Sequence, residues 1–312
     1  MDVLRKENKA AALGALELQC PPMPQTLLEA MELMHQPEGP QIRQVIGMVE
    51  NDPGVVARLL RVVNSAYYGQ RGDITSVRRA VVILGSVSVT GIVMSMGLHE
   101  VRDSLDADTA LPFLNLVRHS IATAFIARHL IAHESGRTAR ANPALQDRLG
   151  DAYTAALLHD FGKLVLLYNH PEIGVNLYGS DRQSNGPDEE FLELERSWFG
   201  FDHVEAGVYL TRRLNFPEAL TTAIALHHRD TYLDEVDAAT KQLIYVVKAA
   251  NKAASGLGFA SSHAVSWKRC TEDPTWARLT GEGIIGYSDP DMLFQDLLEL
   301  KPVLSDYVDL VV

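Results

Sequence analysis

An apolar run from Ala152 to Tyr168 contains three polar residues that a buried helix could not leave without partners. These are the adjacent His159 and Asp160, followed by Lys163. The alanines and leucines of the run, and its lack of proline, predict a continuous helix in which residues three and four apart share one face. Burying such groups unpaired costs about 2 kcal/mol or more each. The chain must therefore fold so that other polar groups meet them.

Histidines from distant parts of the sequence could supply these partners. They are His119, His203 and the adjacent pair His227 and His228. Imidazoles grouped with a carboxylate are typical ligands of divalent Mn, Fe or Zn, and a water bound to such an ion can attack phosphate esters. One hypothesis is therefore that one of these metals is held by His119, His159, Asp160, His203, His227 and His228.

Two interpretations of these residues stay open. In a metal-dependent phosphohydrolase, Lys163 would be catalytic and would stabilise an oxygen of the substrate phosphate. In the alternative, His159, Asp160 and Lys163 form a self-sufficient buried triad that joins helices, and His119 is a hydrogen-bonded core residue. The dipole at helix C-termini would then hold the remaining histidines, which are His203, His227 and His228.

Apolar residues recur every three to four positions through most of the chain, and strand signals are nearly absent. This period predicts an all-α fold. Asp52 followed by Pro53 is a typical helix start, because the aspartate caps backbone N–H groups and proline suits the first helical position. The uncharged nineteen-residue stretch Ala80–Leu98 is long enough to cross a bilayer, but Gly85 is a typical helix stop. We therefore expect two short buried helices there and no membrane span.

The charge is uneven along the chain. The net charge of −12 argues against general binding of nucleic acids, which needs clustered Lys and Arg. Residues 41–80 nevertheless carry six basic and three acidic side chains, whereas residues 181–240 carry five basic and thirteen acidic ones. Four arginines of the basic segment are candidates for binding a phosphate or a partner protein, although a solvated helix face is the simpler interpretation. They are Arg58, Arg61, Arg78 and Arg79.

The two cysteines, Cys20 and Cys270, lie far apart and give neither a disulfide framework nor zinc-ligand spacing. No signal-peptide pattern is visible in the charged first residues, so we expect a cytoplasmic protein. Between His99 and Pro112 the composition turns acidic and helical periodicity is lost, which indicates a boundary. We expect an N-terminal helical lobe over residues 1–110, a helical core over residues 111–255 and a C-terminal helical extension over residues 256–312.

Two groups of motifs resemble known families. His119 together with Leu158-His-Asp-Phe-Gly-Lys163 resembles the HD-domain signature of metal-dependent phosphohydrolases. Longer segments resemble the HDOD family, the HD-related output domain of bacterial signalling proteins. These segments are Pro21–Pro24, Asn51–Gly69, Ile74–Ser76 and Ala80–Gly85. The resemblance extends over about residues 15–230, and the part from Asp52 to Ser65 is specific to the HDOD family.

The resemblance to the HDOD family implies an all-α regulatory module of bacterial signalling, with the N-terminal lobe packed on an HD-like core. Members of this family are commonly thought to be non-catalytic. The resemblance therefore implies action through a signalling protein partner or through a bound ligand such as a nucleotide or a cyclic dinucleotide. Similarity to the related HD-GYP phosphodiesterases implies that His203, His227 and His228 are additional metal ligands.

The sequence departs from its hydrolytic relatives at two positions. An HD domain has its last metal-binding aspartate in the helix where this chain has Asn251, and the HD-GYP branch can use a glutamate where this chain has Asn115. No Gly-Tyr-Pro follows His228. Because an amide binds metals far less well than a carboxylate, we expect a weakened two-metal centre and a module without hydrolase activity. Metal-dependent hydrolysis of a nucleotide or cyclic dinucleotide is the alternative hypothesis.

Overall fold

The computed structural model describes residues 18–312 except for residues 20, 35, 37–38, 66, 69–72, 135–142, 180–187, 230–232, 261–266, 282–286 and 288. The described residues form helices and their connections, with no strand among them, so the predicted all-α fold is confirmed. The helices are α2 (Gln25–Met34), α3 (Ile42–Glu50), α4 (Pro53–Val63), α5 (Val77–Leu84), α6 (Ser86–Val101), η1 (Arg102–Ser104), α7 (Ala107–Glu134), α8 (Pro143–Leu158), α9 (Phe161–Asn169), α10 (Pro171–Tyr178), α11 (Asp188–Phe199), α12 (His203–Arg213), α13 (Glu218–Leu226), η3 (Leu233–Glu235), α14 (Ala238–Gly256), α15 (Trp267–Thr271), α16 (Pro274–Gly281) and α17 (Pro290–Val311).

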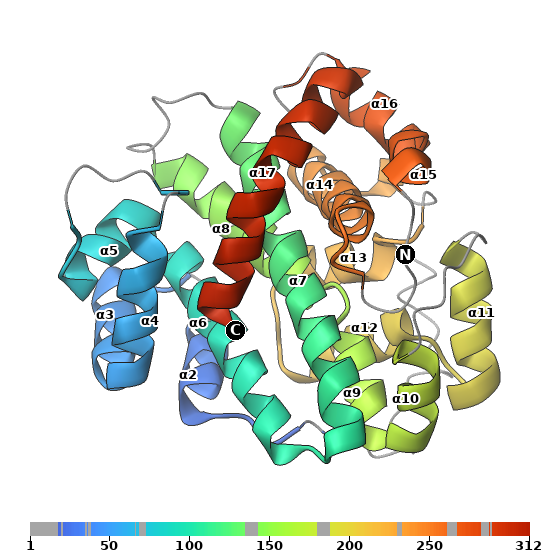
Figure 1. Cartoon of the computed structure of the whole chain (residues 1–312), viewed down its shortest axis with the longest axis horizontal. Coiled ribbons are helices and arrows are strands. Elements are labelled where there is room, and N and C mark those ends of the chain that lie inside the picture. The colour runs from blue at the N-terminus through green and yellow to red at the C-terminus, as the bar shows by residue number, and fades with distance from the viewer. Residues whose placement is uncertain are drawn as a thin grey trace.

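The helices α3, α4 and α5 lie together at the left of Figure 1. The predicted start of α4 is confirmed, because Asp52 Oδ1 accepts hydrogen bonds from the backbone N–H groups of Gly54 at 2.8 Å and Val55 at 3.2 Å. Pro53 takes the first helical position, where no N–H is needed. Val55 and Leu59, one turn apart, are buried and fix the face of α4 that packs inward.

Gly85 separates α5 from α6, as the sequence predicted. Its φ of 84° lies in the left-handed region that glycine adopts without strain, and the helices bend by 111° at this point. α6 is buried along most of its length and packs against α2 and α8. Among the described residues, one helix segment, Ala107–Ala132, is long and apolar enough to cross a membrane, yet 72% of its most apolar window is buried inside the protein. Such burial is typical of a core helix.

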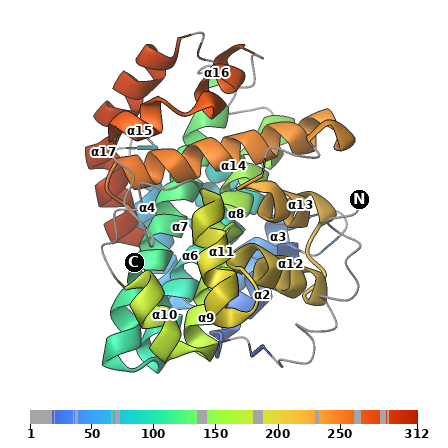
Figure 2. The same ribbon diagram turned by 90° about the vertical axis from the view of Figure 1, so that its right-hand side faces the viewer.

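α7 is the central helix and packs against α8 and α14 (Figure 1). Figure 2 shows α14 lying across it. α7 begins at Ala107 because Asp106 caps it, with Oδ1 accepting from the N–H groups of Asp108 at 3.1 Å and Thr109 at 2.9 Å. The α-helical order that was expected to be lost between His99 and Pro112 is interrupted only over residues 102–106, between α6 and α7. The expected domain boundary after residue 110 falls inside α7 and stays a prediction.

The C-terminal helix α17 crosses the face of the molecule seen in Figure 1 and contacts α4, α6 and α7. Buried hydroxyl groups join it to the core. The Tyr307 and Tyr153 hydroxyls are 3.0 Å apart, and the Tyr153 hydroxyl is also 3.0 Å from Ser95 Oγ. Arg128 nearby is buried and donates to the Tyr68 hydroxyl at 3.0 Å. α17 thus packs on both the N-terminal helices and α7.

Candidate metal centre

The helix that the sequence predicted over Ala152–Tyr168 is interrupted. α8 ends just before His159, the pair His159 and Asp160 forms a turn, and α9 begins directly after it. The prediction of one continuous helix is therefore wrong. Successive side chains on a helix point about 100° apart. The turn instead lets the side chains of His159 and Asp160 point into the same cluster. Lys163 still meets Asp160, with Nζ donating to Oδ2 at 2.8 Å.

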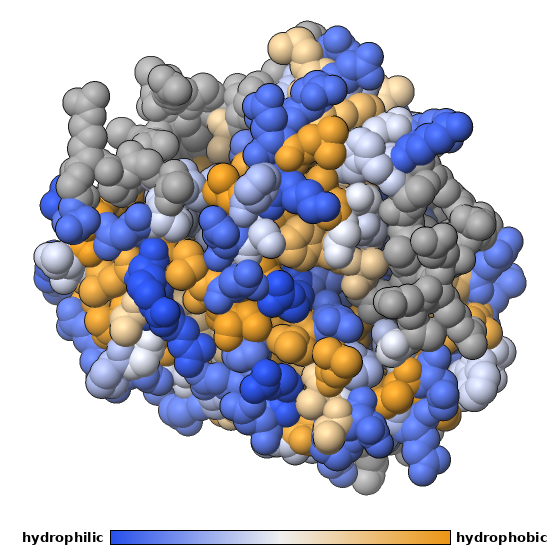
Figure 3. Space-filling view, viewed as in Figure 1, coloured by the Kyte–Doolittle hydropathy of each residue, from blue (hydrophilic) through white to orange (hydrophobic). Residues whose placement is uncertain are grey.

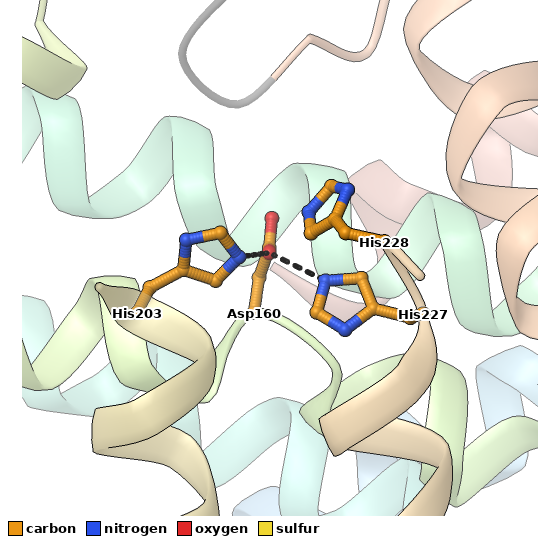
Figure 4. A group of neighbouring side chains, drawn as sticks. All are labelled: Asp160, His203, His227 and His228. Atoms are coloured by element: carbon orange, nitrogen blue, oxygen red, sulfur yellow. Dashed lines mark ion pairs between the residues drawn. The ribbon is translucent and has the colours of Figure 1, made fainter. Parts of the chain in front are cut away.

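The structure brings all six residues predicted as metal ligands together, in two groups that share Asp160. The ligand atoms of the first group, His119, His159 and Asp160, lie within 4.8 Å of one another. The same holds for the second group, which is Asp160, His203, His227 and His228. Figure 4 shows Asp160 between His203 and His227, with His228 beside them. Every member is buried except His228, which is half-buried.

The Nδ1 atom of four of these rings is already bound to the protein. Each Nδ1 faces a carbonyl or carboxylate oxygen, which can only accept, so each Nδ1 carries a proton. In a neutral ring the other nitrogen, Nε2, then presents a lone pair. The acceptors are Phe259 O for His119 (2.5 Å), Ala156 O for His159 (2.7 Å), Glu195 Oε2 for His203 (2.6 Å) and Ile224 O for His227 (2.7 Å).

The Nε2 atoms of these four rings converge on Asp160. They lie 3.3 to 3.7 Å from its nearer oxygen and have no hydrogen-bond partner among the described residues. A buried acceptor without a donor costs about 1–3 kcal/mol, and lone pairs directed at a carboxylate repel it. A divalent cation between Asp160 and the rings that face it would satisfy the nitrogen atoms that it contacts, and the donor set suits Mn, Fe or Zn. The group could therefore hold a metal ion.

Asp160 is ionised in this environment. Burial alone would raise its pKa, but the neighbouring His159 and Lys163 outweigh burial and hold the pKa well below the usual value. Lys163 is only 2% exposed, and its Nζ lies 5.6 Å from the centre of the Phe191 ring, within range of a cation–π contact. The cluster thus combines one fixed negative charge with one fixed positive charge.

The rings of His119 and His227 are neutral near neutral pH. Burial is the main reason that the pKa of His119 falls to about 3. Burial also holds the pKa of His227 well below its usual value. Because a metal binds the neutral imidazole, an ion need not displace protons from these two rings.

Two buried residues that the sequence did not point to complete the site. Glu195 in α11 accepts hydrogen bonds from His203 Nδ1 at 2.6 Å and from the His203 backbone N–H at 3.0 Å, and its other oxygen accepts from the Tyr178 hydroxyl at 2.8 Å. Burial alone would raise the pKa of Glu195, but His203 outweighs it and keeps the pKa below the usual value. In the sequence Glu195 is one of thirteen acidic residues in its segment, so no signal marked it.

Few carboxylates accompany the imidazoles. α14, which carries Asn251, contains no His, Cys, Asp or Glu, so this helix can supply no anionic ligand. Asn115 is exposed on α7, one turn before the buried His119. Asp160 is the one carboxylate in the two ligand groups of the described residues.

The four arginines lie elsewhere, on α4 and α5. Arg58 pairs with Glu100 of α6, with 2.8 Å between Nη2 and Oε1. The other three, Arg61, Arg78 and Arg79, are exposed and form no ion pair with a described residue. Their role in binding a phosphate or a partner stays a prediction.

The HDOD domain family model matches residues 20–230. The chain belongs to the HDOD domain family. An uncharacterized protein of Treponema pallidum (strain Nichols) is 28% identical to this HDOD chain over 231 residues, which is 74% of this chain and 41% of that protein. This chain therefore spans about two fifths of the length of that curated relative.

Solved structures share the fold of this HDOD chain. An HDOD domain protein of unknown function from Geobacter sulfurreducens is 20% identical with a TM-score of 0.65, and the match covers 97% of this chain and 96% of that one. A candidate signal transduction protein from Marinobacter aquaeolei is 21% identical with a TM-score of 0.62, over 96% of this chain and 61% of that one. A candidate metal-dependent phosphohydrolase from Shewanella amazonensis is 16% identical with a TM-score of 0.61, and the match covers 99% of this chain and 100% of that one. At these identities the likeness shows the fold alone.

Proposed function

We propose that this chain is a non-catalytic regulatory module of a signalling system, with a divalent metal ion held at the Asp160 cluster. It acts by binding a signalling protein or a small ligand, and it does not hydrolyse that ligand. Membership of the HDOD family and the name of the Marinobacter structure support the signalling role.

The observation that carries this proposal is the composition of the cluster. In the two ligand groups found among the described residues, five histidines surround a single carboxylate, Asp160. Two-metal hydrolases place concentrated positive charge beside the attacking and leaving oxygens, and anionic ligands must balance that charge. Asp160 balances little of it, because its Oδ2 is already bound by Lys163 at 2.8 Å. Lys163 is thus engaged with Asp160 and Phe191 instead of being directed at a phosphate.

An ion bound by these residues would join separate helices. The turn after α8 supplies Asp160, the start of α12 supplies His203, and the turn after α13 supplies His227. When bound, the ion supplies Lewis acidity and a cross-link between these helices. Fixing them in one arrangement would give a partner a defined surface to bind.

Turnover assays on the full chain test this proposal. Protein loaded with Mn, Fe or Zn is incubated with cyclic dinucleotides, nucleotides and a chromogenic phosphodiester, and the products are separated and quantified. We expect no turnover above that of the Asp160→Ala variant treated in the same way. Metal-dependent hydrolysis that Asp160→Ala abolishes would overturn the proposal.

One observation favours a metal-dependent phosphohydrolase as the second candidate. The two ligand groups share Asp160, and a shared carboxylate suits two ions that lie about 3.5–4 Å apart, as in two-metal phosphatases. In that case all six ligands would hold metal, and Lys163 would turn to the substrate phosphate. The name of the Shewanella structure supports this candidate. Turnover in the assay above would decide in its favour.

A further inference from the structure

The two oxygens of Asp160 face different groups. Oδ2 lies 2.8 Å from Lys163 Nζ, 3.3 Å from His159 Nε2 and 3.6 Å from His119 Nε2. Oδ1 lies 3.3 Å from His203 Nε2 and 3.7 Å from His227 Nε2. Asp160 therefore divides the cluster into an Oδ2 side, with His119 and His159, and an Oδ1 side, with His203 and His227. His228 belongs to the same ligand group as His203 and His227 and is counted with the Oδ1 side.

The distances between ligand atoms suit a metal on either side. With metal–nitrogen and metal–oxygen bonds of about 2.0–2.1 Å, neighbouring ligand atoms of a tetrahedral site lie about 3.4 Å apart. Both pairs of distances, 3.3 and 3.6 Å on the Oδ2 side and 3.3 and 3.7 Å on the Oδ1 side, lie near this value. Distance alone does not choose between the two sides.

A cation already occupies the Oδ2 side. The Lys163 ammonium group is buried there against Asp160, and its Nζ lies 5.6 Å from the centre of the Phe191 ring. A divalent ion bound to the same oxygen would lie within a few ångströms of this ammonium group, in surroundings that screen their repulsion poorly. The Oδ2 side also offers three ligands, since α14 contributes no histidine or carboxylate.

The Oδ1 side has more ligands and a second negative charge behind them. Its four members are Asp160, His203, His227 and His228. Glu195 is fully buried and binds His203 Nδ1 at 2.6 Å, which fixes the ring and makes Nε2 a stronger donor. His228 is half-buried, whereas His119 and His159 are fully buried.

We propose that the cluster holds one divalent ion, bound on the Oδ1 side by Asp160, His203, His227 and His228. Glu195 is a positioning residue for this ion, acting through His203. The Oδ2 side holds no second ion, because the Lys163 ammonium group takes its place. This inference rests on the metal-binding part of the proposed function and makes no use of the absence of hydrolysis.

Titration of the metal-stripped full chain with Co²⁺ tests the number of ions. Elemental analysis after gel filtration gives the ratio of cobalt to protein, and the visible spectrum of Co²⁺ reports the ligands. We expect one ion per chain, retained in His119→Ala and lost in His203→Ala. Two ions in the unchanged protein, or one ion that is lost in His119→Ala and retained in His203→Ala, would overturn the proposal.

Glu195→Gln tests the positioning residue with little change of shape. We expect Co²⁺ affinity to fall by about 10–100-fold and the visible bands to shift, while the helical circular dichroism is unchanged. The matched control is Glu193→Gln, because Glu193 lies on the same helix with an exposed side chain. Equal Co²⁺ affinities in Glu195→Gln and Glu193→Gln would overturn the role of Glu195.

Lys163→Met tests the Oδ2 side directly. Removing the ammonium group should let a second Co²⁺ bind at His119, His159 and Asp160, so the ratio should rise from one to two. A ratio that stays at one would overturn the assigned role of Lys163. These counts are independent of turnover: hydrolysis by a protein with one ion would contradict only the proposed function, and two ions without hydrolysis would contradict only this inference.

Discussion

The helices that carry the candidate metal ligands and the N-terminal helices α3 to α5 place their charged groups in opposite ways. Asp160, Lys163 and Glu195 are at most 2% exposed, and the histidine rings beside them point inward. On α4 and α5, by contrast, Arg61 and Arg78 are exposed, and in Figure 3 hydrophilic and hydrophobic side chains are interspersed over the helices at the left. Buried polar groups need a specific partner or ion, whereas exposed ones are satisfied by water. The structure of the Asp160 cluster therefore indicates that it can bind an ion, whereas the structure of α3 to α5 indicates no ligand.

The largest expected effect comes from Asp160→Asn in the metal-free protein. This variant leaves the Lys163 ammonium group buried without its carboxylate, which costs about 3–5 kcal/mol of unfolding free energy. Arg58→Met is the matched change in the N-terminal helices, where the side chains of Arg58 and Glu100 are 26% and 32% exposed. It should cost less than about 1 kcal/mol. Urea unfolding of both variants measures the difference, and equal costs would remove the contrast between the regions.

A smaller effect is expected from adding one methyl group where α9 meets α12. A Cβ on Gly162 would fall on the backbone carbonyl of His203. Gly162→Ala should therefore push α12 away, lower the unfolding free energy by about 1–3 kcal/mol and weaken Co²⁺ binding through His203. Gly47→Ala in α3 is the control, because a Cβ there meets nothing within 4 Å.

Gly47→Ala should instead stabilise the protein by about 0.5–1 kcal/mol, since alanine favours a helix more than glycine does. Thermal unfolding and Co²⁺ titration of both glycine variants check the pair of predictions. A Gly162→Ala protein that keeps full stability and full metal affinity would show that α9 and α12 are not held together as closely as the structure indicates.

The smallest effects are expected from the exposed arginines. Arg61→Ala, Arg78→Ala and Arg79→Ala should each change the unfolding free energy by no more than about 0.5 kcal/mol. None should change the number of Co²⁺ ions bound, because none of these side chains belongs to either ligand group. A loss of metal in any of them, measured by elemental analysis, would show that the two regions are coupled.

Helix ends were predictable where the signal is local. Asp52 caps its own helix through backbone groups two and three residues away. Gly85 ends the helix before it because its own φ is positive. The turn at His159 and Asp160 carries no such signal, since alanine and leucine before it favour a continued helix. It is explained by tertiary contacts, in which both side chains meet groups from other helices.

Which residues come together in the cluster was predictable from residue type and motif, but the residues that position them were not. Histidine and aspartate in an apolar run are unusual enough to stand out. Glu195 is not, because a buried glutamate in an acidic segment looks like its exposed neighbours such as Glu193. Its role depends on the fold, which places the middle of α11 behind the first residue of α12.

Anomalous X-ray scattering at the cobalt edge, from crystals of the full chain grown with Co²⁺, tests the metal assignment most directly. We predict a single strong peak within bonding distance of Asp160 Oδ1 and of Nε2 of His203 and His227. No peak in the cluster, or a second peak of equal height beside His119 and His159, would contradict it.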